Sequence, residues 1–232
     1  VLVLENSELL PYDFFSMAPI TRARRISTLS AYLKEKEITL ISSIATLLSP
    51  VPKPIHISPL NNLSVGDSFD PESVINEIIL NGYSRVDFVS LPGHYALRGS
   101  VMDIFLTSGT EPIRIEFFNN QIESLRIFNP ESQITHEKIN HINFLPSYEY
   151  PLNRNSAEIF KKEWRKRFEL FEEDSELFRK IMNLRHPEGA EIYFPLFYGT
   201  KSDFIPFLQY ADQIYIQNSV YEKGHDFEEL IN

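Results

Sequence analysis

The sequence predicts an α/β body into which a small α+β module is inserted. Apolar strand-like runs alternate with helical segments in residues 1–54, and residues 146–232 repeat this style. Residues 55–145 instead combine one helical segment with a succession of strand-like segments, which is typical of a mainly antiparallel sheet with a helix behind it. The proline-rich segment SPVPKPIHISP marks the first boundary, near residue 54, because its four prolines resist regular structure.

The first part is predicted to run strand, loop, helix, strand and helix. The VLVL run at residues 1–4 and the EITLIS run at residues 37–42 indicate two buried strands. Between them, the segment LPYDFF favours a loop, and a helix is expected from Thr21. A short helix should follow from Ser43 to Leu48. Buried strands separated by a helix favour a parallel pair.

The module helix is predicted to begin at Asp70-Pro71 and to end at Asn81-Gly82. Aspartate accepts hydrogen bonds from a first helical turn, and proline suits the first helical position. Glycine suits the left-handed conformation that commonly ends a helix. The apolar face of this helix should be formed by Val74, Ile75, Ile78 and Ile79.

The rest of the module is predicted to be strands. The strand-like segments are residues 86–90, 94–106, 113–118 and 122–128. A tight loop at residues 119–120 would place Phe117 opposite Ile122. The same register would place Glu116 opposite Glu123.

The last part is predicted to return to helices and buried strands. Asn155 and Glu158 match a capping box, so a helix should begin there. A second helix is expected from Ser175 to Leu184. Residues 189–199 (GAEIYFPLFYG) and 213–218 (QIYIQN) resemble strands, and we expect them to complete the sheet that the first part begins.

Composition excludes several kinds of protein. The 232 residues contain no cysteine, which excludes disulfides, thiolate metal sites and cysteine nucleophiles. The formal charge of −10 disfavours nucleic acid as the default partner, because it repels phosphate. No apolar run approaches the roughly 20 residues that span a bilayer, so we expect a soluble, cytoplasmic protein with no membrane partner. The chain opens on Val1 instead of methionine, and we expect it to be a piece of a longer protein.

No motif predicts catalysis, a metal or a cofactor in this segment. Neither the phosphate-binding loop G-x-x-x-x-G-K-[ST] nor the nucleophile elbow G-x-S-x-G occurs. His136 and His141 are five residues apart, whereas a zinc-binding helix needs a spacing of four to bring both rings to one face.

A basic helical run, KKEWRKR (residues 161–167), is a lesser candidate site. Its cations share a surface broadly opposite an aromatic stripe and could contact phosphate groups. A solvated polar face is the simpler interpretation, and direct DNA contact stays an open question for Lys161, Lys162, Arg165 and Lys166.

The run IRIEFF, residues 113–118, carries the main candidate site. Strand alternation places its aliphatic residues on one face and Arg114, Glu116 and Phe118 on the other. A singly exposed phenylalanine is common in proteins. An arginine beside an exposed ring on a rigid strand is nevertheless the chemistry of a protein-interface hot spot, and Arg98 lies on an adjacent predicted strand.

Longer blocks of the sequence resemble a known family. These blocks are PGHYALRGSVMDIF, EPIRIEFFNNQIESLRIFNPESQ, INFLPSYEYP, GAEIYFPLFY, LPYDFF and the helix RISTL. Together they resemble the N-terminal region shared by the bacterial transcription-repair coupling factors (Mfd) and the nucleotide-excision-repair protein UvrB. The resemblance covers nearly the whole chain, and the order and spacing of the blocks make it more specific than any short motif.

The resemblance implies a protein-recruiting function without catalysis in this segment. In this family the intermediate module, here residues 55–145, binds UvrA, the damage-sensing ATPase of excision repair. The flanking parts, here residues 1–54 and 146–232, form a degenerate helicase-like body derived from the RecA-type fold. Carried over by position, the family's UvrA contacts fall on Arg98, Arg114 and Phe118.

The resemblance also implies a larger parent protein, an ATP-dependent DNA translocase. Its ATP and Mg²⁺ sites, and its contacts with RNA polymerase and DNA, would lie in domains outside this segment. A C-terminal domain of the parent would mask the UvrA-binding surface at rest.

Two alternatives stay open. The chain could be the N-terminal fragment of a UvrB-type, ATP-dependent, damage-binding helicase, although UvrB's long DNA-clamping hairpin is not visible here and the FKKEWRKRFE helix looks like a coupling factor. It could also be a scaffold with no UvrA role.

Overall fold

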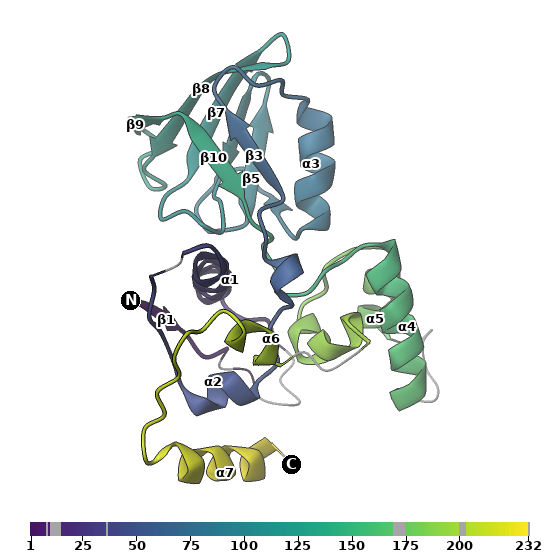
Figure 1. Cartoon of the computed structure of the whole chain (residues 1–232). Coiled ribbons are helices and arrows are strands. Elements are labelled where there is room, and N and C mark those ends of the chain that lie inside the picture. The colour runs from purple at the N-terminus through teal and green to yellow at the C-terminus, as the bar shows by residue number, and fades with distance from the viewer. Residues whose placement is uncertain (8, 10–14, 36, 169–174, 200–202, 232) are drawn as a thin grey trace.

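The computed structural model describes residues 1–7, 9, 15–35, 37–168, 175–199 and 203–231. It is a mixed α/β structure with small sheets, as the sequence predicts in outline. In Figure 1 a sheet with one long flanking helix stands above a lower part made mostly of helices. The chain enters the upper part at β3 (Asn61–Ser64) and leaves it at β10 (His141–Phe144), and these two strands pair antiparallel.

The upper part is built on a six-stranded sheet in the order β4-β5-β6-β7-β8-β9. Only β4 and β5 run parallel, so the prediction of a mainly antiparallel sheet is confirmed. The strands are β4 Ser84–Arg85, β5 His94–Arg98, β6 Val101–Ile104, β7 Ile113–Phe118, β8 Gln121–Phe128 and β9 Thr135–Ile139. One face packs against helix α3 (Pro71–Leu80) and β3 to form the core of this part.

Helix α3 begins and ends where its local signals predict. The side chain of Asp70 accepts a hydrogen bond from the backbone N–H of Ser73 at 3.3 Å, and Pro71 occupies the first helical position. Gly82 has φ +89°, which glycine adopts without strain. A Cβ atom at Gly82 would lie 2.1 Å from the Tyr148 ring, so glycine also permits close packing against the lower part.

Two strand predictions in the module were wrong. Residues 86–90 do not continue the short strand β4. Val86 and Val89 instead pack over Phe128, on the face of the sheet opposite the core. The run 94–106 is not one strand but the hairpin β5–β6, which turns at Gly99 with φ +59°. Strand β6 therefore separates Arg98 from β7, so Arg98 is not on the strand adjacent to Arg114.

The hairpin between β7 and β8 forms with one change of register. Asn119 and Asn120 both adopt positive φ, and Phe117 faces Ile122 as predicted. Glu116 faces Ser124, not Glu123, because the register shifts between Glu116 and Phe117. The shift avoids a direct carboxylate pair and lets Ser124 donate a hydrogen bond to Glu116 at 2.5 Å.

The first segment of the lower part is a strand–helix–strand unit. Strands β1 (Leu2–Leu4) and β2 (Leu40–Ser42) pair parallel, as predicted, and α1 (Pro19–Lys34) connects them. The strands are not fully buried, since Val3 and Ile41 are more than half exposed. Helices α2 (Ile44–Leu48) and η1 (Pro54–His56) follow. The predicted LPYDFF loop lies largely outside the described residues, which exclude 10–14.

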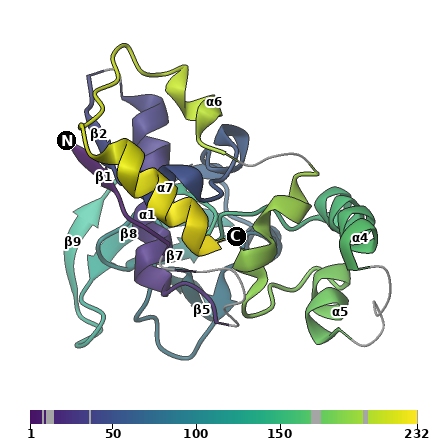
Figure 2. The same cartoon turned by 90° about the horizontal axis from the view of Figure 1, so that it is seen from below.

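After the module the chain is helical. The elements are α4 (Arg154–Phe168), α5 (Glu176–Met182), the 3₁₀ helix η2 (Ala190–Phe197), α6 (Ile205–Leu208) and α7 (Val220–Ile231). The capping box of α4 uses Asn153 and Ser156 instead of the predicted pair: each side chain accepts a hydrogen bond from the other residue's backbone N–H. Helix α7 packs against α2 on the side of the lower part away from the module, as Figures 1 and 2 show.

The two strands predicted in this last part do not form. Residues 190–197 are a 3₁₀ helix whose Pro195 has no N–H to donate to a sheet ladder. Residues 213–218 are not helix or strand, and Ile214 and Ile216 are more than half exposed. Within the described residues, β1 and β2 therefore remain a two-stranded sheet.

One hydrophobic cluster joins the two ends of the chain. It combines residues before the module and residues after it with Ile57 and Leu145 from the two ends of the module: Leu4, Ile26, Leu29, Tyr32, Val51, Ile57, Leu145, Phe204 and Phe207. Two buried ion pairs cross the same junction. Arg25 of α1 binds Glu149 through both carboxylate oxygens, at 2.5 and 3.1 Å, and Arg22 contacts Glu191 at 3.2 Å.

His186 links the module to the helices below it and makes stability depend on pH. Its ring stacks on Tyr148 with centroids 4.3 Å apart, and its Nε2 lies 3.2 Å from the Leu80 carbonyl oxygen at the end of α3. Burial lowers the pKa of His186 from 6.5 to about 4. The unfolded chain therefore binds a proton that the folded chain resists between these two values.

We expect the free energy of unfolding to fall by about 2 kcal/mol through His186 as the pH drops from about 6.5 to about 4. The His186→Gln variant should lose this part of the slope in urea unfolding measured across that range. Burial also lowers the pKa of His56 and His94, so some slope should remain. His225→Gln, on exposed α7, should match the unmodified chain. An unchanged slope in His186→Gln would contradict the assignment.

Among the described residues, none of the helices combines the length and the apolar character of a membrane span.

Candidate functional site

The candidate site lies on the outer face of the six-stranded sheet, opposite the core. Side chains alternate between the two faces, so Met102 and Ile115 point into the core while their neighbours Asp103 and Arg114 point outward. One cross-strand row on the outer face runs over five strands, β5 to β9. In register order it comprises Ala96, Asp103, Arg114, Arg126 and Lys138.

Asp103 holds both predicted arginines at the centre of this face. Its two oxygens accept hydrogen bonds from Nε and Nη2 of Arg114, at 2.7 and 2.9 Å. Its Oδ2 also accepts from Nη1 of Arg98, at 3.4 Å. The Asp103 side chain is only 2% exposed, whereas Arg98 is 51% and Arg114 is 23% exposed. One carboxylate thus fixes two guanidinium groups and leaves one net positive charge facing solvent.

Electrostatics keep Arg114 in its charged form. Hydrogen bonding to Asp103 raises the pKa of Arg114, and the charges of Asp103 and Glu116 act in the same direction. Its guanidinium also lies 5.0 Å from the centre of the Phe128 ring, which is fully buried beneath it. Arg114 is therefore held in place by the Phe128 ring below it and by two hydrogen bonds to the Asp103 carboxylate.

Phe118 exposes its ring at the end of β7. It is 62% exposed, whereas the preceding Phe117 turns toward the core and contacts Phe69 with ring centroids 4.9 Å apart. The prediction that Phe118 lies on the outward side of the strand is therefore confirmed. That a partner protein covers this ring stays a prediction.

Arg98 and Phe118 lie at the same end of the sheet. Arg98 ends β5 and pairs with Val101, and the backbone N–H of Phe117 donates to the Ser100 carbonyl in the β5–β6 turn at 3.0 Å. One strand lies between them, so their backbones are about 10 Å apart, twice the usual strand spacing. The structure thus brings the three predicted residues to one face, with Arg98 and Arg114 joined through Asp103.

Sequence reasoning missed two residues of this face, Asp103 and Phe88. Asp103 interrupts the apolar run VMDIF, and a single acid in such a run is a signal that it pairs with a cation. Phe88 follows β4 and is 70% exposed, with Arg98 lying 5.6 Å from its ring centre. The apolar run VDFVS had suggested a strand there, which concealed the outward turn of this ring.

Asp103→Asn should lower the free energy of unfolding by about 2 kcal/mol, because it removes the charge that compensates Arg114 in a half-buried site. Urea unfolding measures this change. Glu116→Gln is the matched control. The Glu116 side chain is 35% exposed, and its ion pair with Arg126 is long, at 3.6 Å. That change should cost no more than about 0.5 kcal/mol. Equal effects of the two variants would show that Asp103 does not organise the site.

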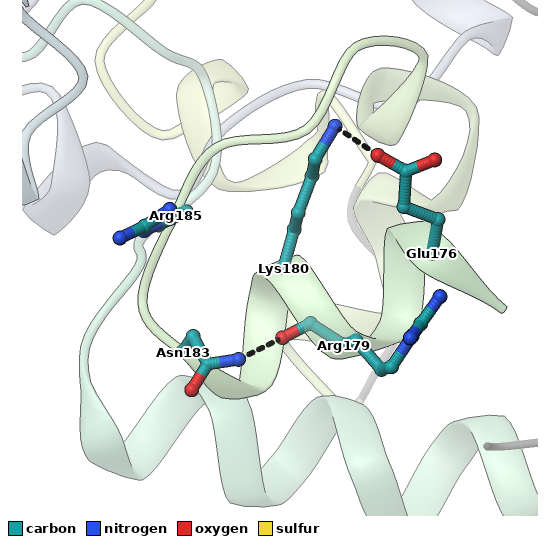
Figure 3. A pocket seen from close by; sticks show the side chains of 5 residues that line it. All are labelled: Glu176, Arg179, Lys180, Asn183 and Arg185. Atoms are coloured by element: carbon teal, nitrogen blue, oxygen red, sulfur yellow. Dashed lines mark hydrogen bonds and ion pairs between the residues drawn. The ribbon is translucent and has the colours of Figure 1, made fainter.

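The basic surfaces of the lower part are weaker candidates. On α4, Trp164 and Phe160 are buried, which confirms the amphipathic pattern, and Lys166 pairs with Glu163 at 2.6 Å. A hollow of about 650 Å³ lies beside α5 and is lined by Glu176, Arg179, Lys180, Asn183 and Arg185, whose side chains are drawn in Figure 3. Lys180 reaches Glu176 at 2.7 Å, and the two arginines extend to different sides. These cations do not converge on one point, as an anion site would require.

The two histidines of HEKINH do not share a helix. His136 lies in β9, where it contacts Glu111 at 3.4 Å, and His141 lies in β10. Over the described part of the chain, no group of three or more histidine or acidic side chains is placed to hold a metal ion.

Comparison with known proteins points to the same part of the chain. Residues 62–150, which include the whole six-stranded sheet, match the model of the family described as the UvrB interaction domain. The chain is 32% identical over 200 residues to the transcription-repair-coupling factor of Escherichia coli, covering 86% of this chain and 17% of that protein. The corresponding protein of Haemophilus influenzae is 30% identical over 212 residues, with 89% and 18% covered.

A more distant relative matches a shorter stretch. The transcription-repair-coupling factor of Bacillus subtilis is 28% identical over 151 residues, covering 64% of this chain and 13% of that protein. The chain therefore spans less than a fifth of the length of the curated relatives it matches.

Proposed function

Because residues 62–150 belong to the UvrB interaction domain family, and because the chain is homologous to part of the transcription-repair-coupling factors, we propose that it recruits UvrA to stalled RNA polymerase. The recruiting step is docking of UvrA on the outer face of the six-stranded sheet. Arg98, Arg114 and Phe118 are its contact residues. No catalytic step is assigned to this segment.

The observation that carries this proposal is the rigid group of two arginines and an exposed ring on one sheet face. Asp103 fixes both guanidinium groups, so little side-chain entropy is lost when a partner binds them. The ring of Phe118 offers apolar area that water covers in the free chain. Fixed cations beside exposed aromatic area are typical of interface hot spots.

The direct test is binding of the purified chain to UvrA from the same organism, measured by isothermal titration calorimetry. We expect saturable binding at one site on each chain. A chain that is folded by circular dichroism and shows no saturable heat with active UvrA would refute the proposal. Arg114→Glu is a poor control here, because it would place a second carboxylate against the buried Asp103 and threaten the fold.

The lower part is proposed to be one helicase-like body related to the RecA-type fold, made of residues 1–54 and 146–232. Its support is the hydrophobic cluster that combines Leu4, Ile26 and Leu29 with Phe204 and Phe207, and the parallel β1–α1–β2 unit. In this proposal residues 55–145 form the UvrA-interaction module inserted into that body.

The remaining functions belong to the proposed parent protein. We assign ATP and Mg²⁺ binding, DNA translocation and RNA polymerase contact to domains outside this chain. Masking of the UvrA surface by a C-terminal domain of the parent is part of the same proposal. On this basis the isolated chain binds UvrA without a trigger.

A further inference from the structure

Phe88 is a second large ring exposed on the outer face, and no function described so far explains it. It is 70% exposed, slightly more than Phe118. It lies in the loop after β4, between Val86 and Val89, which are anchored in the small cluster over Phe105 and Phe128. The loop is therefore held on both sides of the ring, and Phe88 is presented to solvent by a fixed backbone.

Arg98 ties this loop to the candidate site. Its Nη2 donates a hydrogen bond to the Asp87 carbonyl oxygen, and its guanidinium carbon lies 5.6 Å from the centre of the Phe88 ring. The same guanidinium donates through Nη1 to Asp103. Contacts of Arg98 therefore connect Phe88 to Asp103, and Asp103 in turn binds Arg114.

The two exposed rings flank the arginines. Strand order places the β4 loop with Phe88 on one side of β5, and β7 with Phe118 on the other side, beyond β6. Arg98 lies between them at the same end of the sheet. The surface therefore presents apolar, cationic and apolar groups in succession across the strands.

The unused N–H groups of Arg98 and Arg114 suit one anionic group. Arg114 donates Nε–H and one hydrogen of Nη2 to Asp103, which leaves the second hydrogen of Nη2 and both hydrogens of Nη1. Arg98 uses one hydrogen on each of its terminal nitrogens in these bonds, which leaves one on each and the hydrogen of Nε. Two arginines and one aspartate also leave a single positive charge to be matched.

We propose that Phe88 is a further contact residue of the docking surface, and that the UvrA segment bound there presents a carboxylate between two apolar side chains. One apolar side chain packs on Phe88 and the other on Phe118, while the carboxylate accepts hydrogen bonds from Arg98 and Arg114. This inference rests on the proposed function and adds a contact that the family resemblance did not supply.

The test is calorimetric titration of UvrA with Phe88→Ala and Phe88→Leu variants of the chain. Phe88→Ala should raise the Kd about tenfold or more, because it removes most of the apolar contact. Phe88→Leu should have a smaller effect, since it keeps apolar area and loses only the aromatic face. Unfolding curves of both variants should match the unmodified chain, as the ring is largely in water.

A double variant separates direct contact from positioning of Arg98. If Phe88 touches UvrA, Arg98→Ala with Phe88→Ala should bind more weakly than Arg98→Ala alone. If Phe88 only orients Arg98, the double variant should bind like Arg98→Ala, and the inference is wrong. Raising the salt concentration should weaken binding of the unmodified chain more than binding of Arg98→Ala, because the carboxylate contact is charged. If binding of the unmodified chain and binding of Arg98→Ala depend equally on salt, the proposal that UvrA presents a carboxylate to Arg98 is wrong.

The outcomes distinguish this inference from the function on which it rests. Absence of UvrA binding by the unmodified chain removes both. Normal UvrA binding by Phe88→Ala, together with loss of binding by Phe118→Ala, removes only the inference and leaves the proposed function in place.

Discussion

Phe118→Ala should weaken UvrA binding by about 2 kcal/mol, which is about thirtyfold in Kd, while leaving the fold unchanged. The ring is 62% exposed at the end of β7, so its removal creates no cavity in the core. The free energy of unfolding should therefore stay within about 0.5 kcal/mol of the unmodified chain. Calorimetric titration with UvrA and urea unfolding measure the two quantities.

Phe15→Ala is the matched control for this prediction. Phe15 is the same residue type and is 54% exposed, but it precedes α1 in the lower part and is not on the sheet face. It should bind UvrA like the unmodified chain. If both phenylalanine variants bind equally well, Phe118 is an exposed ring without a partner and the site assignment fails.

Arg25→Met should produce the largest loss of stability, about 3 kcal/mol or more in the free energy of unfolding. The Arg25 side chain is fully buried, and its guanidinium binds both oxygens of Glu149 and the Glu5 carbonyl oxygen. Methionine fills similar space but leaves the Glu149 carboxylate, 5% exposed, without its partner. Urea unfolding of the variant and the unmodified chain measures the loss.

Two further variants show whether the loss comes from the orphaned charge. Arg24→Met, on the same helix, breaks an exposed pair with Glu5 and should cost less than about 1 kcal/mol. Arg25→Met combined with Glu149→Leu should regain much of the stability, because both charges are then absent. A double variant as unstable as Arg25→Met would mean that packing of the arginine stem, not charge, dominates.

Local signals predicted those parts of the fold whose physics is local. Asp70, Pro71 and Gly82 act within their own helix, so the bounds of α3 follow from residues next to them. The tight turn at Asn119-Asn120 is equally local, because positive φ is a property of the two residues themselves. Alternation along β7 predicted which face each side chain takes, and the exposed ring of Phe118 follows from it.

Predictions failed where an apolar run had more than one place to be buried. Residues 86–90 were expected in a strand, yet Val86 and Val89 pack on the outer face of the sheet. The run at 189–199 was expected to be a strand, but residues 190–197 form a 3₁₀ helix whose Phe197 packs against Phe160 and Tyr150. Hydrophobicity predicts that such residues are buried, whereas the backbone conformation depends on which partner covers them.

By itself, the sequence determined the mixed α/β class, the helix–hairpin framework of the module and the outward positions of Arg114 and Phe118. Only the tertiary structure decided that β6 separates Arg98 from β7, that Asp103 joins the two arginines, and that Phe88 flanks them. The physical reason is that side chains alternate between the two faces along a single strand, so their direction can be predicted from that strand alone. Which charges pair depends instead on the register between neighbouring strands.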